Sequence, residues 1–174
     1  MNQISIIIPC YNEINFLEKI VQRVLETNIQ DKQIIIIDDF SSDGTRELIK
    51  NKIEPMVHKV VYHEKNKGKG ACIKSAIEFI KGDIVIIQDA DLEYNPSDHE
   101  KLINLMLNSK ADVVYGNRFS KNNPNLSLYP TNRFANFILT FLTNILVDLK
   151  ISDMETGLKC FRKEVIKSIN LIED

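Results

Sequence analysis

Short, uninterrupted runs of isoleucine and valine recur along the chain, and polar residues follow each run. Runs of this kind, rich in β-branched residues, are typical of strands that are buried on both faces, as in parallel sheets. The predicted strands are residues 4–8, 34–37, 60–62, 84–87 and 112–115.

Segments with apolar residues at helical spacing separate these runs, and they predict helices over about 16–25, 71–80 and 97–107. A further helix is predicted to run through Ile49, with Ser42 or Asp43 as its cap. The alternation of strand and helix predicts an α/β fold: a mostly parallel sheet with helices on both faces.

Three acidic residues, Asp89, Asp91 and Glu93, follow the strand 84–87 at alternate positions. In an extended segment, alternate side chains project to the same side. Clustered carboxylates repel one another unless a cation lies between them, and such hard oxygen ligands suit Mg²⁺ or Mn²⁺. The pattern therefore predicts a divalent metal that holds a phosphorylated ligand. The alternative is a solvated acidic turn before the helix that begins near Pro96.

The loops that follow the first four predicted strands all contain polar or charged residues, among them 9–13, 39–45 and the glycine-rich basic loop 66–70. In an open α/β sheet, ligands bind outside the carboxyl ends of the strands. These loops therefore predict one ligand site along that edge of the sheet.

Composition excludes several classes of protein. A chain of 174 residues with 44% hydrophobic and 26% charged residues suits a single globular domain. A net charge of -2, with no basic run, gives no reason to expect nucleic acid as a partner. Cys10, Cys72 and Cys160 are widely spaced and fit core positions in a reducing compartment. Because no signal-peptide pattern or membrane-spanning stretch is found, we expect a cytoplasmic protein.

Residues 131–149 also have helical periodicity, with a broad apolar face that polar residues interrupt. Two alternatives fit: a core helix, or a helix that also touches a lipid surface. Residues 153–157 form a second acidic loop, residues 158–162 a short strand, and a last helix begins at Lys163. The apolar face comprises Phe134, Phe137, Ile138, Phe141, Leu142, Ile145 and Leu146; the interruptions are Asn136, Thr140, Thr143 and Asn144.

Five motifs resemble, in order, those of the family 2 inverting glycosyltransferases, which have the Rossmann-like GT-A fold. They are Pro9-x-Tyr11-Asn12-Glu13, Asp38-Asp39-x-Ser-x-Asp43-Gly44-Thr45, Asn66-x-Gly68-Lys69-Gly70, Asp89-x-Asp91 and Gly116-Asn117-Arg118. Asn132-Arg133 and the loop 153–157, followed by Lys-x-Phe-Arg, resemble the branch of dolichol-phosphate mannose synthases and bacterial polyprenyl-phosphate glycosyltransferases.

The resemblance covers essentially the whole chain and implies a single GT-A domain over residues 1–174. Because members of the family usually continue past the position of Asp174, we expect this chain to be truncated at its C-terminus.

The resemblance implies a role for each matched residue. The nucleotide-sugar pocket would be formed by Pro9, Tyr11, Glu13, Asp39, Lys69, Asp89 and Ala90. Asp89, Asp91 and Glu93 would hold Mg²⁺ or Mn²⁺. Arg118 and Arg133 would bind the acceptor phosphate, and Asp153 would lie near the sugar or acceptor. The expected catalytic residues are Asp91, Arg118 and Asp153.

Structural alternatives exist for several of these residues. Lys69 and Glu93 are also compatible with solvated side chains, and Arg133 with a residue that only begins a helix. Asp38 is predicted to cap or pair locally. The three histidines, His58, His63 and His99, lack metal-ligand spacing and are interpreted as structural or surface residues.

The resulting hypothesis is metal-dependent transfer of a sugar, with inversion, from a GDP- or UDP-sugar. A sugar hydroxyl as acceptor must lose a proton, and Asp153 is the candidate base. A polyprenyl phosphate needs no base, because a phosphate monoester with a second pKa of about 6 is largely a dianion at neutral pH. We favour the polyprenyl phosphate, oriented by arginines, with peripheral contact at the cytoplasmic face of the membrane.

Two other functions are kept as alternatives: transfer to a carbohydrate hydroxyl, and a non-catalytic nucleotide-binding module. A nucleotidyltransferase is disfavoured. A protein of that class would carry a glycine-rich basic loop directly after the first strand, whereas Pro-Cys-Tyr-Asn-Glu follows that strand here.

Overall fold

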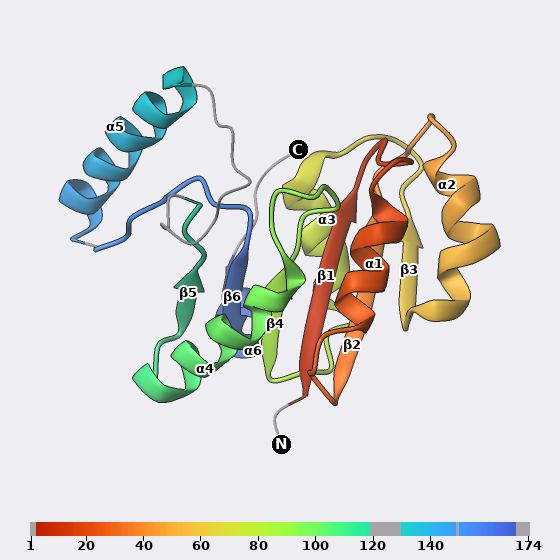
Figure 1. The fold of residues 1–174 in the computed structure, drawn as a ribbon, viewed down its shortest axis with the longest axis horizontal. Coiled ribbons are helices and arrows are strands. Elements are labelled where there is room, and N and C mark those ends of the chain that lie inside the picture. The colour runs from red at the N-terminus through yellow and green to blue at the C-terminus, as the bar shows by residue number, and fades with distance from the viewer. Residues whose placement is uncertain (1–2, 119–129, 149, 170–174) are drawn as a thin grey trace.

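Six strands form one mixed sheet in the order β3-β2-β1-β4-β6-β5 (Figure 1). The computed structural model describes residues 3–118, 130–148 and 150–169, and the side chains of residues 130–133 lie outside that description. The strands are β1 (Ile4–Cys10), β2 (Lys32–Asp38), β3 (Lys59–Tyr62), β4 (Ile84–Ile87), β5 (Val113–Tyr115) and β6 (Lys159–Arg162). The first four strands pair in parallel, and β6 is antiparallel to both of its neighbours. The predicted mostly parallel α/β sheet is therefore confirmed, with one antiparallel strand inserted.

Helices cover both faces of this sheet, as predicted. On one face lie α1 (Leu17–Leu25), α2 (Thr45–Leu48) with the π-helical turn Ile49–Ile53 that continues it, and α4 (His99–Ser109). On the other face lie α3 (Gly68–Ile77) and α6 (Lys163–Ser168). Two short 3₁₀ turns, Glu54–Met56 and Pro96–Asp98, complete the connections.

The isoleucine runs supply the apolar core on both faces of the sheet. Successive side chains of a strand point to opposite faces, so Ile6 and Ile8 pack with α1 while Ile7 packs with α3. All seven residues of β1 are buried. This double burial explains why the strand sequences are continuously apolar.

The antiparallel pairing of β5 and β6 brings two distant loops together. Tyr115, the last residue of β5, pairs with Lys159, the first residue of β6. The backbone N–H of Gly116 donates to the carbonyl of Leu158 at 2.9 Å. The segment after β5 and the acidic loop before β6 therefore meet at the same edge of the sheet.

Helix α5 (Pro130–Val147) lies apart from the sheet, beyond the end formed by β5 and β6 (Figure 1). Its apolar side chains face outward: Phe137 is 67% exposed and Leu146 is 80% exposed. The core-helix alternative for this segment is therefore wrong, because all seven residues of its predicted apolar face are exposed. Within the described ranges, no helix combines the length and apolar character needed to cross a bilayer.

Candidate active site

A pocket of about 280 Å³ opens at the carboxyl ends of β1, β2 and β4. All seven residues predicted to bind the nucleotide sugar line it. The lining comprises Pro9, Cys10, Tyr11, Glu13, Asp39, Lys69, Cys72, Asp89, Ala90 and Asp91. The parallel strands place these residues together although they come from four separate motifs.

The first two motif loops are joined by reciprocal hydrogen bonds. The N–H of Asn12 donates to Ser41 Oγ at 2.9 Å, and the N–H of Ser42 donates to Asn12 Oδ1 at 2.8 Å. The N–H of Glu13 donates to Thr45 Oγ1 at 2.9 Å. These contacts hold Tyr11 and Glu13 at the pocket wall.

Asp43, predicted with Ser42 as a candidate cap, accepts a hydrogen bond at 3.0 Å from the backbone N–H of Thr45, the first residue of α2. Asp43 also accepts from Thr45 Oγ1 at 2.6 Å. The N-cap of α2 is Gly44, so the prediction of Ser42 or Asp43 as the cap is wrong, although Asp43 binds the first residue of the helix.

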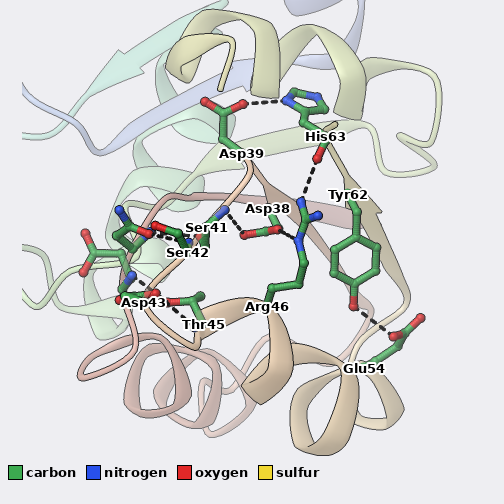
Figure 2. A network of polar contacts seen from close by, with 12 residues as sticks. Asp38, Asp39, Ser41, Ser42, Asp43, Thr45, Arg46, Glu54, Tyr62 and His63 are labelled. Atoms are coloured by element: carbon green, nitrogen blue, oxygen red, sulfur yellow. Dashed lines mark hydrogen bonds and ion pairs between the residues drawn. The ribbon is translucent and has the colours of Figure 1, made fainter. Parts of the chain in front are cut away.

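Asp39 is buried and bound on both carboxylate oxygens. Oδ1 lies 2.6 Å from His63 Nδ1 (Figure 2). Oδ1 also accepts from the N–H of Lys67, and Oδ2 accepts from the N–H of Gly68 at 2.8 Å. Burial alone would raise the pKa of Asp39, but the hydrogen bonds from His63 and the two backbone N–H groups hold it below its ordinary value. Asp39 thus stays ionised and anchors the first turn of α3.

Asp38 has the structural role predicted for it. Its Oδ2 accepts from Arg46 Nε at 2.6 Å, and the guanidinium also donates to the carbonyl of His63 at 2.7 Å (Figure 2). The Arg46 guanidinium lies over the rings of Phe40 and Tyr62, at 5.5 and 5.4 Å from their centroids. Asp38 is fully buried and fastens β2 to α2 and β3.

The segment after β4 that carries the three acidic residues bends at Asp91 and Glu93 and is not an extended strand. Their alternate spacing therefore does not by itself place the three side chains on one side. Asp89 and Asp91 both line the pocket, and Glu93 does not. The N–H of Glu93 donates to Asp91 Oδ1 at 2.9 Å. Lys69 forms an ion pair with Asp89, and its side chain is 48% exposed.

Negative charge accumulates around Asp91. Burial raises the pKa of Asp91, and the charge of Asp89 raises it further. Burial also raises the pKa of Glu13 and of Glu93. Among nearby charges, that of Asp91 raises both of these pKa values the most. Carboxylate oxygens are hard donors that bind Mg²⁺ or Mn²⁺, and a bound cation would offset the repulsion between these carboxylates. The carboxylates of Asp89 and Asp91 at the pocket wall are donors of the kind that a divalent cation binds, but the ligand atoms of Asp89, Asp91 and Glu93 do not all lie within 4.8 Å of one another.

Gly157 allows the second acidic loop to close on Asp89. A Cβ atom at this position would lie 1.8 Å from Asp89 Oδ2. The N–H of Gly157 donates to the Tyr94 hydroxyl at 2.6 Å, which fixes the loop against the segment that follows Asp91. The contact was not visible in the sequence, because 68 positions separate Gly157 from Asp89.

Arg118 and Asp153 form a bidentate pair at the junction of β5 and β6. The guanidinium donates through Nε and Nη2 to the two oxygens of Asp153, both at 2.9 Å, and the Arg118 N–H donates to Oδ2 at 3.0 Å. The hydrogen bonds to Asp153 raise the pKa of Arg118. Asp153 is fully buried, and both of its oxygens are bound to Arg118.

A polar stripe on α5 holds the loop that contains Asp153. Asn144 donates to the carbonyl of Ile151 at 2.9 Å and accepts from its N–H at 3.0 Å. Thr140 accepts from the N–H of Met154 at 3.1 Å, and Asn136 accepts from the N–H of Glu155 at 3.3 Å. The polar residues that interrupt the apolar face therefore attach α5 to the site. Arg133 lies in the first turn of α5, and its side chain is outside the described part.

The histidines have structural roles, as predicted. His58 Nδ1 accepts from the N–H of Ile34, and His63 bridges Asp39 and Ser75. His99 is buried against Gln88, at 2.7 Å, and burial lowers its pKa to about 4.

Within the described ranges, the one group of three side chains of metal-ligand type whose atoms lie within 4.8 Å of one another is Asp39, His63 and Cys72. Burial raises the pKa of Cys72 to about 12. In the absence of a cation the thiol is therefore protonated at neutral pH. All three cysteines are buried and free, as predicted.

Comparisons with known proteins agree with this geometry. The sequence model described as "Glycosyl transferase family 2" matches residues 5–169. A UDP-N-acetylglucosamine–dolichyl-phosphate N-acetylglucosaminyltransferase of Methanococcus voltae is 29% identical over 184 residues, which cover 96% of this chain and 72% of that protein. A dolichol-phosphate mannosyltransferase of Pyrococcus furiosus is 28% identical over 173 residues, which cover 97% of this chain and 49% of that protein.

A solved structure has a similar fold. It is a mannosyltransferase from Pyrobaculum calidifontis in complex with GDP-Man and Mn²⁺, with a TM-score of 0.69 and 19% identity. The match covers 95% of this chain and 46% of that one. The chain thus spans about half the length of two of these three proteins.

Proposed function

Because the chain belongs to glycosyl transferase family 2 and has the GT-A fold, we propose that it transfers a sugar from a GDP- or UDP-sugar to a polyprenyl phosphate. Transfer would proceed with inversion and depend on a divalent metal. The observation that supports this most strongly is the pocket itself. Seven residues from four motifs line it beside Asp91, at the sheet edge where ligands of α/β proteins bind.

The donor half of the proposal assigns roles to the pocket residues. Tyr11, Glu13 and Asp39 would contact the nucleoside, and Lys69 would approach the diphosphate once its partner Asp89 binds a cation. Asp89, Asp91 and Glu93 would hold Mg²⁺ or Mn²⁺, which when bound neutralises charge on the departing diphosphate. Positioning by the rigid loops 9–13 and 39–45 would then provide most of the acceleration.

The acceptor half rests on Arg118 and Asp153. A carbohydrate acceptor needs a base, yet both oxygens of Asp153 accept from the Arg118 guanidinium. An acceptor hydroxyl that donated to Asp153 would have to compete with this guanidinium for the carboxylate. A phosphate acceptor needs no base and needs guanidinium groups to orient it. We therefore assign Arg118 and Arg133 to the acceptor phosphate and Asp153 to positioning Arg118.

Peripheral contact with a membrane completes the proposal. The exposed apolar face of α5 belongs to the helix whose polar side holds the Asp153 loop. We propose that this apolar face lies in the membrane interface, as the apolar faces of amphipathic interfacial helices do. The two relatives named above act, by their names, on dolichyl phosphates, which are membrane lipids.

Nucleotide binding tests the donor half directly. Melting temperatures are measured with UDP, GDP, CDP and dTDP, each with Mn²⁺ and with EDTA. A ligand at one hundred times its Kd stabilises a protein by about 2.7 kcal/mol, which moves the melting temperature by a few degrees. We expect a Mn²⁺-dependent shift with UDP or GDP that is lost in Asp91→Asn. The absence of any shift in the wild-type protein would refute the donor site.

A non-catalytic nucleotide-binding module would show the same shift, so turnover separates the two functions. We expect Mn²⁺-dependent release of the nucleoside diphosphate from its sugar conjugate when polyprenyl phosphate is added. Binding without turnover would favour the module.

A further inference from the structure

Lys159 lies on the strand between the donor pocket and the Arg118–Asp153 pair. In β6 it is paired with Ile87 of β4 on one side and Tyr115 of β5 on the other. Asp89 follows Ile87 by two residues, and Arg118 follows Tyr115 by three. Lys159 is thus a cationic residue at the carboxyl edge of the sheet, flanked by the segments that lead to both halves of the site.

Lys159 is partly buried, and its ammonium group has no carboxylate partner among the residues that the structure describes. It lies 5.1 Å from the centroid of the Tyr115 ring. Burial lowers the pKa of Lys159, the charge of Lys69 lowers it further, and Asp89 and Asp153 oppose this effect from a distance. A partly buried cation without a counter-ion costs free energy, and a bound anion would offset that cost.

Lys32 shows how this protein satisfies a lysine with a purely structural role. Its ammonium donates to the carbonyls of Val24, Leu25 and Thr27 at 3.0, 2.6 and 2.7 Å. Within residues 3–118, 130–148 and 150–169, Lys159 has no such set of acceptors, although it occupies a comparable partly buried position. The contrast indicates that the acceptor for Lys159 is supplied by a ligand.

We propose that Lys159 binds a phosphate oxygen of a substrate, between the donor pocket and Arg118. This inference rests on the proposed function and extends it to a residue that the motif analysis did not assign. Two phosphate groups have the required chemistry: the diphosphate of the donor and the phosphate of the acceptor. Both are oxyanions that a lysine binds as a point charge.

The test uses three variants. Lys159→Met removes the charge and keeps the length of the side chain, and Lys159→Arg keeps the charge. Lys59→Met is the matched control, because Lys59 is also a partly buried strand lysine over an aromatic ring, 4.5 Å from the centroid of Phe79, but at the amino end of β3. Affinity for UDP and GDP with Mn²⁺ is measured by calorimetry, KM for polyprenyl phosphate by turnover, and stability by thermal unfolding.

We expect Lys159→Met either to bind nucleotide at least tenfold more weakly or to have an at least tenfold higher KM for polyprenyl phosphate, in both cases without a lower melting temperature. A weaker nucleotide affinity assigns the contact to the donor diphosphate, and a higher acceptor KM assigns it to the acceptor phosphate. A structural lysine would instead give a lower melting temperature with both quantities unchanged, which would overturn the proposal. If affinity and melting temperature fall together, restoration of affinity by Lys159→Arg supports the proposal and no restoration refutes it.

The proposed function fails in a different way. A wild-type protein that binds neither UDP nor GDP refutes the function itself. A wild-type protein that binds nucleotide and turns over, with a Lys159→Met variant that matches Lys59→Met in both quantities, refutes only the role of Lys159.

Discussion

Helices α1 and α5 share one sequence pattern and pack in opposite ways. Both have apolar residues at helical spacing, but α1 buries Leu17, Ile20, Val21 and Val24 against the sheet, whereas α5 turns its apolar face outward. The difference lies in the polar residues. In α1, Gln22 and Glu18 hydrogen-bond each other on the surface, whereas in α5 the polar side chains bind the backbone of the Asp153 loop. Helical periodicity therefore shows that a helix has an apolar face and leaves open what covers it.

The sharpest way to break this comparison is a matched pair of isoleucine truncations. Ile20 is fully buried in α1, and Ile145 in α5 is 62% exposed. Truncation of a buried isoleucine to alanine costs about 2–5 kcal/mol, because it removes buried methyl groups and leaves a cavity. We expect Ile20→Ala to show this loss in chemical unfolding. An exposed site changes stability by about 0.5 kcal/mol or less, and we expect this of Ile145→Ala. Equal losses would mean that α5 packs into a core.

The second prediction tests what covers the apolar face of α5. Leu142→Ser with Leu146→Ser should weaken binding to phospholipid vesicles by about 3 kcal/mol. A leucine moved entirely from water into an apolar phase contributes about 1.5–3 kcal/mol, and these two residues are 46% and 80% exposed before binding. That corresponds to a loss of up to about 100-fold in partitioning, measured by vesicle sedimentation. The control is Leu105→Ser with Leu107→Ser, two exposed leucines of α4, which should bind vesicles as the wild type does. Equal vesicle binding by wild type and the α5 variant would contradict membrane contact.

The smallest expected effect concerns the polar side of α5. Asn144→Ala removes two hydrogen bonds to Ile151, and each such bond contributes about 0.5–1.5 kcal/mol. We expect faster amide hydrogen exchange in residues 151–155 with little change in global stability, because the loss is local. Thr143→Ala is the control, since the Thr143 hydroxyl contacts only the Met154 sulfur in the described part of the chain. Unchanged exchange in Asn144→Ala would show that α5 does not hold the Asp153 loop.

Much of the sheet and of the donor pocket was predictable from the sequence. The strand at Ile84–Ile87 matches its prediction at both ends, because polar residues, Asp83 and Gln88, flank the apolar run directly. The motif residues line one pocket because the carboxyl ends of parallel strands lie at the same edge of the sheet. The roles of the individual residues, including Arg133, stay predictions.

What escaped prediction depended on contacts between distant positions. Helix α3 begins at Gly68 rather than near residue 71, because the carboxylate of Asp39 accepts from the N–H groups of Lys67 and Gly68. The place of β6 beside β4 was equally invisible, since a strand of four residues does not specify its partners. The approach of Gly157 to Asp89 and the partly buried position of Lys159 both follow from that pairing.

Sugar transfer by wild-type protein and by Arg133→Ala, measured with Mn²⁺ and with polyprenyl phosphate or a carbohydrate as acceptor, decides which acceptor the protein uses. The account predicts that wild-type protein transfers sugar to the lipid phosphate and not to the carbohydrate. It also predicts that Arg133→Ala abolishes transfer to the lipid while the nucleotide-induced rise in melting temperature stays intact. Transfer to the carbohydrate alone, or unchanged transfer to the lipid by Arg133→Ala, would contradict the account.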